Sequence, residues 1–128
     1  MLKCIINHVE KDMTVYIVQE MRGRDLTDAL AFGDLEILLP AEEQLTFSTQ
    51  PTLVRMNRML RNFTDSDYLL LSGDPTAIAL AACVVAKINN GRFKVLKWDR
   101  KENKYFPLTV DTNSKKSTVD TSSYNVGR

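Results

Sequence analysis

The sequence predicts an α/β fold: a Rossmann-like mixed sheet of about five strands, with a parallel core and a C-terminal β-hairpin at one edge. The main observation is the segment 67–99, DYLLLSGDPTAIALAACVVAKINNGRFKVLKWD. Its order of apolar strand, sharp turn, helix and alternating strand is typical of two parallel strands joined by a crossover helix. A charged turn at residues 99–103 then leads into a strand-like run at 105–110, which indicates a hairpin.

Chain length and charge limit the class of protein. The chain has 128 residues, enough for one domain with its own core. We place that domain at residues 14–111, between an N-terminal extension at 1–13 and a polar C-terminal tail at 112–128. The net charge of +1 gives no overall attraction to nucleic acid or anionic lipid. The longest apolar run, residues 77–86, is too short to span a bilayer.

Cysteine and histidine usage points to a cytoplasmic protein. The two cysteines, Cys4 and Cys83, are far apart, and His8 is the single histidine. Reduced thiols are the simplest interpretation. Cys83 lies in an apolar helical run, and we expect it to be a small buried core residue. Because these three residues are too few and too scattered for a zinc site, we expect neither a metal nor a cofactor.

The first half of the domain predicts two strands and a short helix. Residues 14–18 are β-branched and aromatic, and they predict the first strand. The carboxylate of Asp25 can cap a short helix at residues 26–32, which Gly33 ends. Residues 35–39 predict the next strand, stopped by Pro40.

An amphipathic helix follows. It begins at Pro51, where the missing donor costs nothing, and runs to Phe63. Its apolar positions Leu53, Met56 and Phe63, with Met59 or Leu60, have a helical period. Before it, residues 45–47 are compatible with a short strand.

The second half carries the crossover unit. Residues 68–71 form a continuous apolar run, as expected for a parallel strand in the sheet interior. Asp74 and Pro75 then begin a helix that continues to about Ile88 and is apolar nearly all round, which predicts a buried helix. We expect a right-handed crossover. A helix this apolar also predicts a homo-oligomer, most simply a dimer.

The Ser72–Gly73–Asp74–Pro75 turn is a candidate ligand site. It falls at the carboxyl end of a strand and the amino end of a helix, where parallel sheets usually bind ligands. Ser72, Gly73, Asp74 and Thr76 are the groups that would contact a ligand. The turn lacks the glycines and the Lys-Ser/Thr pair of a phosphate loop. A plain helix cap in a tight crossover is the alternative.

Arginines and one tryptophan are candidates for contact with a partner. Arg55, Arg58 and Arg61 repeat every three residues opposite the apolar stripe of their helix, where they can bind phosphates or an acidic protein surface. A solvated helix face is the alternative. Trp98 and Arg100 combine aromatic and cationic character, as interface hot spots do. The alternative for Trp98 is packing of the hairpin on the sheet.

Catalysis finds little support in the sequence. Carboxylates are numerous, but no spacing selects an acid–base pair. One histidine near the amino end is a weak basis for nucleophilic chemistry. We therefore favour a protein that is not an enzyme.

Three blocks of the sequence carry a resemblance to known proteins. They are Gly23 to Thr27 (GRDLT), Asp67 to Pro75 (DYLLLSGDP) and Gly91 to Arg100 (GRFKVLKWDR). Over residues 14–111 the chain resembles small uncharacterised proteins of tailed bacteriophages, which implies a protein made inside an infected bacterial cell. Leu71-Ser72-Gly73 before an alanine-rich helix also resembles CRISPR-associated Rossmann-fold sensor domains, although Asp74 and Pro75 depart from their pattern.

These observations predict a non-catalytic, phage-type accessory protein that binds a bacterial or phage protein. One alternative is a binder of a nucleotide or nucleotide-derived signal at the turn around Ser72–Thr76. A second alternative is nucleic-acid binding through the arginine face.

Overall fold

The computed structural model describes residues 13–43, 45 and 48–113. The predictions made for residues 1–12, 46–47 and 114–128 lie outside these described residues, as do Cys4 and His8. One five-stranded sheet with the strand order β2-β1-β3-β4-β5 organises the described chain. The α/β class and the mixed five-stranded sheet that we predicted are confirmed.

The parallel part of the sheet contains four strands. They are β1 (Thr14–Gln19), β2 (Asp34–Leu39), β3 (Tyr68–Leu70) and β4 (Arg92–Asp99). Strand β1 pairs with β2 on one side and β3 on the other, and β3 pairs with β4, all in parallel. The predicted hairpin is also confirmed, since β5 (Lys104–Asp111) pairs with β4 antiparallel.

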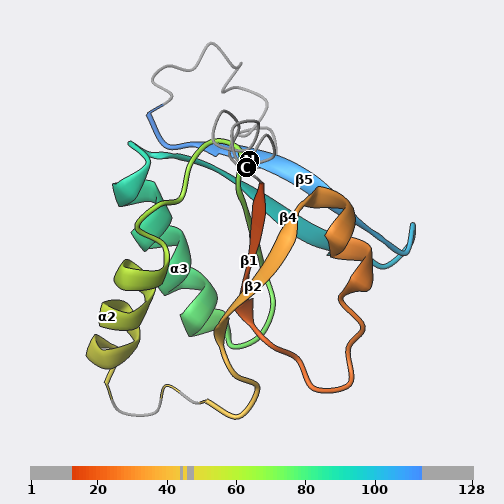
Figure 1. The fold of residues 1–128 in the computed structure, drawn as a ribbon, viewed down its shortest axis with the longest axis horizontal. Coiled ribbons are helices and arrows are strands. Elements are labelled where there is room, and N and C mark those ends of the chain that lie inside the picture. Colours follow the sequence, from red (N-terminus) through yellow and green to blue (C-terminus); the bar gives the residue numbers. More distant parts are fainter. Residues whose placement is uncertain (1–12, 44, 46–47, 114–128) are drawn as a thin grey trace, which may run out of the picture.

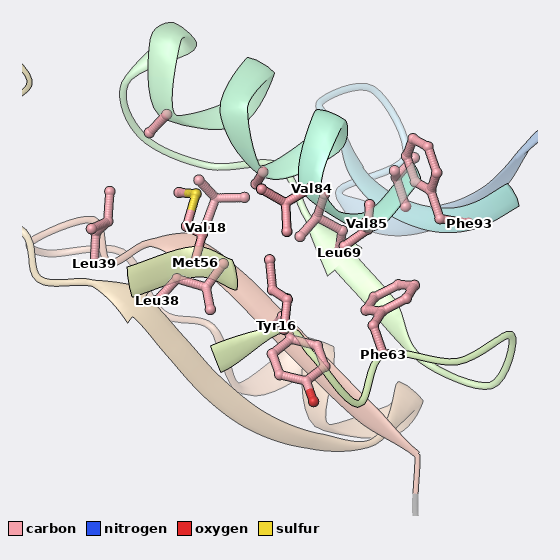
Figure 2. Packing of buried hydrophobic residues seen from close by; sticks show 14 residues of the cluster. Tyr16, Val18, Leu38, Leu39, Met56, Phe63, Leu69, Val84, Val85 and Phe93 are labelled. Atoms are coloured by element: carbon pink, nitrogen blue, oxygen red, sulfur yellow. The ribbon is translucent and has the colours of Figure 1, made fainter. Parts of the chain in front are cut away.

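Helices α2 (Gln50–Met59) and α3 (Pro75–Ile88) lie on one face of the sheet, and the 3-10 helix η1 (Thr27–Phe32) lies near the other (Figure 1). The larger core fills the α2–α3 side and includes Tyr16, Val18 and Leu38 of the sheet with Val84 and Val85 of α3 (Figure 2). The smaller core includes Val15, Ile17 and Ala29 on the η1 side. Alternation along β1 therefore supplies both cores, because successive strand residues point to opposite faces.

Helix α2 is shorter than the sequence predicted. It ends at Met59 rather than at Phe63, with Leu60 as its C-cap. The apolar period continues in the sequence because Leu60 and Phe63 are still buried, although both lie beyond the end of the helix. The Phe63 ring packs against Tyr16, with ring centroids 5.7 Å apart. Because these core residues keep the helical spacing beyond Met59, the sequence pattern predicted a helix longer than the one observed.

The prediction of a buried Cys83 was wrong, because Cys83 is exposed. Helix α3 buries Ala77, Ala81, Val84 and Val85 on the sheet, but Ala79, Cys83 and Lys87 face outwards. The helix begins and ends as predicted: the Asp74 side chain accepts from the Thr76 N–H at 2.8 Å, and Asn90 and Gly91 follow in the left-handed region. Helix α3 is therefore apolar in composition because it buries one face on the sheet and carries small residues, such as Ala79 and Cys83, on its exposed face.

A buried carboxyl group holds the amino end of β1. The Asp67 side chain is fully buried just before β3. One of its oxygens accepts from the Thr14 N–H at 3.0 Å, and the other accepts from the Thr64 N–H at 2.9 Å. Asp67 therefore joins the loop before β3 to the start of β1.

Candidate functional site

The predicted ligand turn lies at a topological switch point. The chain leaves β1 towards β2 on one side, whereas β3 lies on the other side of β1. In parallel sheets this arrangement opens a crevice at the carboxyl ends of the strands, which is the usual ligand position. Ser72, Gly73 and Asp74 follow β3 at this edge, and a hollow of about 330 Å³ is lined there by Gln19, Met21, Ala41, Glu43, Leu45, Gly73 and Asp74.

The side chain of Gln19, at the end of β1, connects the groups around this crevice. Its Nε2 donates to the backbone oxygens of Pro40 (3.1 Å) and Glu43 (2.8 Å), while its Oε1 accepts from the Asp74 N–H (2.8 Å). The Ser72 hydroxyl donates to the Gln19 backbone oxygen at 2.7 Å. Gln19 is 6% exposed. Polar groups that a ligand would use at the turn are thus paired with the protein itself.

Gly73 is required by this packing. Its φ is +96°, and a Cβ added to it would overlap the Gln19 side chain. Sequence reasoning singled out Gly73 but missed Gln19. The available signal was a glutamine placed directly after a run of strand residues, where the crevice of a parallel sheet begins.

The arginines predicted to bind a partner do not form one cluster with Trp98. Arg55 and Arg58 lie on α2, and Arg61 lies in the turn after it. Arg55 is 3.9 Å from the Glu43 carboxylate. Trp98 and Arg100 belong to the end of the β4–β5 hairpin, which points away from α2 (Figure 1). The structure thus divides the predicted residues between two surfaces.

Trp98 lies between two hollows at the end of the hairpin. The larger one, about 510 Å³, is lined by Lys97, Trp98, Asp99, Arg100, Phe106 and Leu108. The smaller one, about 180 Å³, is lined by Arg24, Asp25, Trp98 and Tyr105. We call these nine residues the Trp98 surface. Aromatic and arginine side chains next to exposed apolar ones are typical of protein interfaces.

The register of the hairpin explains why the two hollows differ. Lys97 pairs with Phe106 and Val95 with Leu108, so these residues share the face that bears α2 and α3. No helix of the described residues covers that end of the sheet, and Leu108 is 48% exposed. Trp98 pairs with Tyr105 on the opposite face, near η1, where their rings meet edge to face at 4.8 Å.

Within residues 13–43, 45 and 48–113, no three His, Cys, Asp or Glu side chains come together as a group that could hold a metal ion. Over the same part of the chain, no helix is long and apolar enough to cross a membrane.

The fold and this surface define a small α/β phage protein, built on one mixed sheet with an exposed aromatic and cationic hairpin end. A family model described as Phage Pam3 gp32-like protein matches residues 13–112, and the chain belongs to that family. The predicted resemblance to phage proteins is therefore confirmed. No curated protein and no solved structure gives a significant match, and the likeness to CRISPR-associated sensor domains has no support among these comparisons.

Proposed function

We propose that this phage protein is an accessory factor that acts in the cytoplasm of the infected bacterium by binding a bacterial or phage protein through the Trp98 surface. The observation that carries this proposal is the position of Trp98 between two hollows that contain Tyr105, Phe106 and exposed Leu108. Truncating such aromatic anchors at interfaces typically costs about 2 kcal/mol or more of binding free energy.

The edge of strand β5 favours recognition by side chains over addition of a partner strand. The Leu96 carbonyl accepts from the Leu71 N–H of the chain before α3, so the backbone polar groups of Leu96 point away from β5. Its cross-strand neighbour Pro107 must then direct its nitrogen to the open edge. A proline there offers no N–H to an incoming strand, which protects an edge from pairing.

The test starts with a tagged form of the protein expressed in infected cells, followed by identification and purification of the captured protein. Binding of that purified partner is then measured by calorimetry for Leu108→Lys and for the control Val54→Lys. Both positions are large exposed apolar residues, at 48% and 57% exposure, but Val54 lies on α2. We expect binding to weaken about tenfold or more for Leu108→Lys only.

Equal affinities for the two variants would refute binding through the Trp98 surface. A loss confined to Val54→Lys would move the site to α2 and its neighbours Arg55 and Arg58. The thermal midpoint of each variant is the folding control. Light scattering and native mass spectrometry of the purified protein test the predicted homo-oligomer, which stays a prediction.

The nucleotide alternative has weaker support. The crevice is in the expected place, but Gln19 uses the Asp74 N–H, and Glu43 and Asp74 line the hollow with acidic side chains that repel phosphates. A thermal shift on adding nucleotides would favour it. The nucleic-acid alternative relies on Arg55, Arg58 and Arg61, and a steep salt dependence of binding would favour it.

A further inference from the structure

Tyr105 contains a buried hydroxyl group whose proton has no acceptor among the described residues. The residue is 5% exposed, and its hydroxyl has no hydrogen-bond partner of ordinary geometry among the described residues. A phenylalanine would fill the same space without burying an unpaired polar atom, which costs folding free energy. The hydroxyl is therefore better explained by a group that pairs with it in a complex.

Tyr105 lines the smaller hollow of the Trp98 surface. Burial raises the pKa of Tyr105. The Arg24 guanidinium lowers the pKa by less, through its charge and its contact as a donor with the hydroxyl oxygen, and Asp28 and Asp25 raise it further. Arg24 and Asp25 line this hollow together with Trp98 and Tyr105, so the charges that act on the hydroxyl are those around the hollow. With a raised pKa, the hydroxyl keeps its proton at neutral pH and remains a donor.

Donors outnumber unengaged acceptors at this hollow. Arg24 is exposed, and no ion pair involves it within the described part of the chain. One oxygen of the Asp25 carboxylate, Oδ1, already accepts from the backbone N–H of Thr27, at 2.9 Å, and from the Thr27 hydroxyl. A guanidinium and a hydroxyl side by side are complementary to a carboxylate, which accepts charge-assisted hydrogen bonds from both.

Resting on the function proposed above, we infer that Tyr105 and Arg24 receive a carboxylate side chain of the partner protein in the hollow beside Trp98. The partner then presents an acidic residue to the η1 side of the hairpin end. The larger hollow with Phe106 and Leu108 lies on the other face of the sheet and takes a separate, apolar part of the partner.

The charge of the hairpin end agrees with an acidic partner. Residues 97–104 contain the cations Lys97, Arg100, Lys101 and Lys104 against the anions Asp99 and Glu102. Asp25 and Asp28 oppose a carboxylate in the smaller hollow, but both are exposed, and water and salt screen exposed charges. The excess of positive charge also accelerates encounter with an acidic surface.

The test uses a random linear peptide library displayed on phage and selected against the immobilised full-length protein. Selected peptides are synthesised, and their affinity is measured by calorimetry. The fluorescence of Trp98, the single tryptophan of the chain, reports whether a peptide binds beside it. We expect acidic peptides that change this fluorescence. Tyr105→Phe and Arg24→Gln should each weaken binding about tenfold or more, the range of a hydrogen bond to a charged group.

The matched control is Arg58→Gln, which removes an exposed arginine from α2 and should leave the affinity unchanged. Tyr105→Phe should fold at least as stably as the natural protein, because it removes an unpaired buried hydroxyl. Replacing the peptide carboxylate by an amide should weaken binding to the natural protein, and should weaken it less in Tyr105→Phe, where only Arg24 still binds the carboxylate.

Three results would count against these claims in different ways. Peptides without acidic residues, or unchanged binding to Tyr105→Phe, would refute the carboxylate site and leave the Trp98 surface standing. Acidic peptides that bind without any change in Trp98 fluorescence and that lose affinity in Arg58→Gln would place binding on α2, which refutes both. If no peptide is enriched and the captured partner is also insensitive to Leu108→Lys, both the carboxylate site and the proposed function fail.

Discussion

The side-chain oxygen of Gln19 accepts a hydrogen bond from the backbone N–H of Asp74 at 2.8 Å and thereby joins the end of β1 to the beginning of α3. The same amide group donates to the backbone oxygens of Pro40 and Glu43, which follow β2. One side chain thus connects three strand ends at the switch point of the sheet. A buried amide with its hydrogen bonds satisfied gives a single defined geometry to the loops it connects.

Gln19→Leu should lower the free energy of unfolding by about 3 kcal/mol, because it removes three hydrogen bonds to part-buried backbone groups of the two loops that follow β2 and β3. The measurement is urea unfolding followed by circular dichroism. Gln50→Leu is the control, since Gln50 is exposed at the start of α2 and should change stability little. Equal losses in the two variants would mean that the Gln19 contacts contribute nothing specific.

Gly73→Ala should be more destabilising than Gly23→Ala. Both glycines have positive φ, +96° and +81°, but a Cβ at Gly73 meets the Gln19 side chain whereas a Cβ at Gly23 meets nothing within 4 Å. Backbone strain alone costs about 1–2 kcal/mol, so we expect about that loss at Gly23 and a clearly larger one at Gly73. Thermal or urea unfolding measures the loss of stability in each variant. Similar losses would show that the Gln19 side chain moves aside for the new methyl group without cost.

Asp67→Asn should lower stability by about 2 kcal/mol, although it changes only one atom of the side chain. Both Asp67 oxygens accept backbone N–H groups, from Thr14 and Thr64, and an amide nitrogen cannot accept either of them. The exposed Asp65, which accepts from Asn89 and Arg92, is the control, and Asp65→Asn should have a small effect. An unfolding curve of Asp67→Asn that overlays that of the natural protein would disprove the role of Asp67.

Stability should fall as the pH rises above 10. Burial, followed by Asp67 and Glu36, raises the pKa of Tyr16 above the ordinary 10.0. The folded state then holds the phenol proton more tightly than the unfolded state does. This contribution is complete below the unfolded pKa and is lost as the pH rises through the folded pKa. Urea unfolding at a series of pH values should show a shallower alkaline decline for Tyr16→Phe than for the natural protein.

Tyr105→Phe should reduce the same decline, because burial also raises the pKa of Tyr105. Lysines deprotonate in this pH range too, so the informative quantity is the difference between each variant and the natural protein. A difference that stays constant from neutral to alkaline pH would show that neither phenol contributes.

Much of the fold could be read from local pattern. The strands from residue 14 and from residue 35, the helix begun by Asp74 and Pro75, and the final hairpin appear where the sequence placed them. Each depends on signals within a few residues: β-branched runs, a side-chain cap, a proline at the first helical position. The end of α2 and the exposure of Cys83 were predicted wrongly, because core contacts made by turn residues and the side of a helix that meets the sheet depend on distant segments.

For the candidate sites too, local sequence signals located some features, and contacts between distant segments decided the others. The sequence by itself located the turn after β3, the arginines of α2 and the aromatic hairpin end, because residue type and spacing are local properties. Only the tertiary structure showed that Gln19 reaches across from β1 to the Asp74 amide, and that Tyr105 meets Trp98 next to Arg24. Gln19 lies far from Asp74 in the chain, and Arg24 lies far from Trp98. Strand order and register, set by the packing of the whole sheet, decide which of these residues meet.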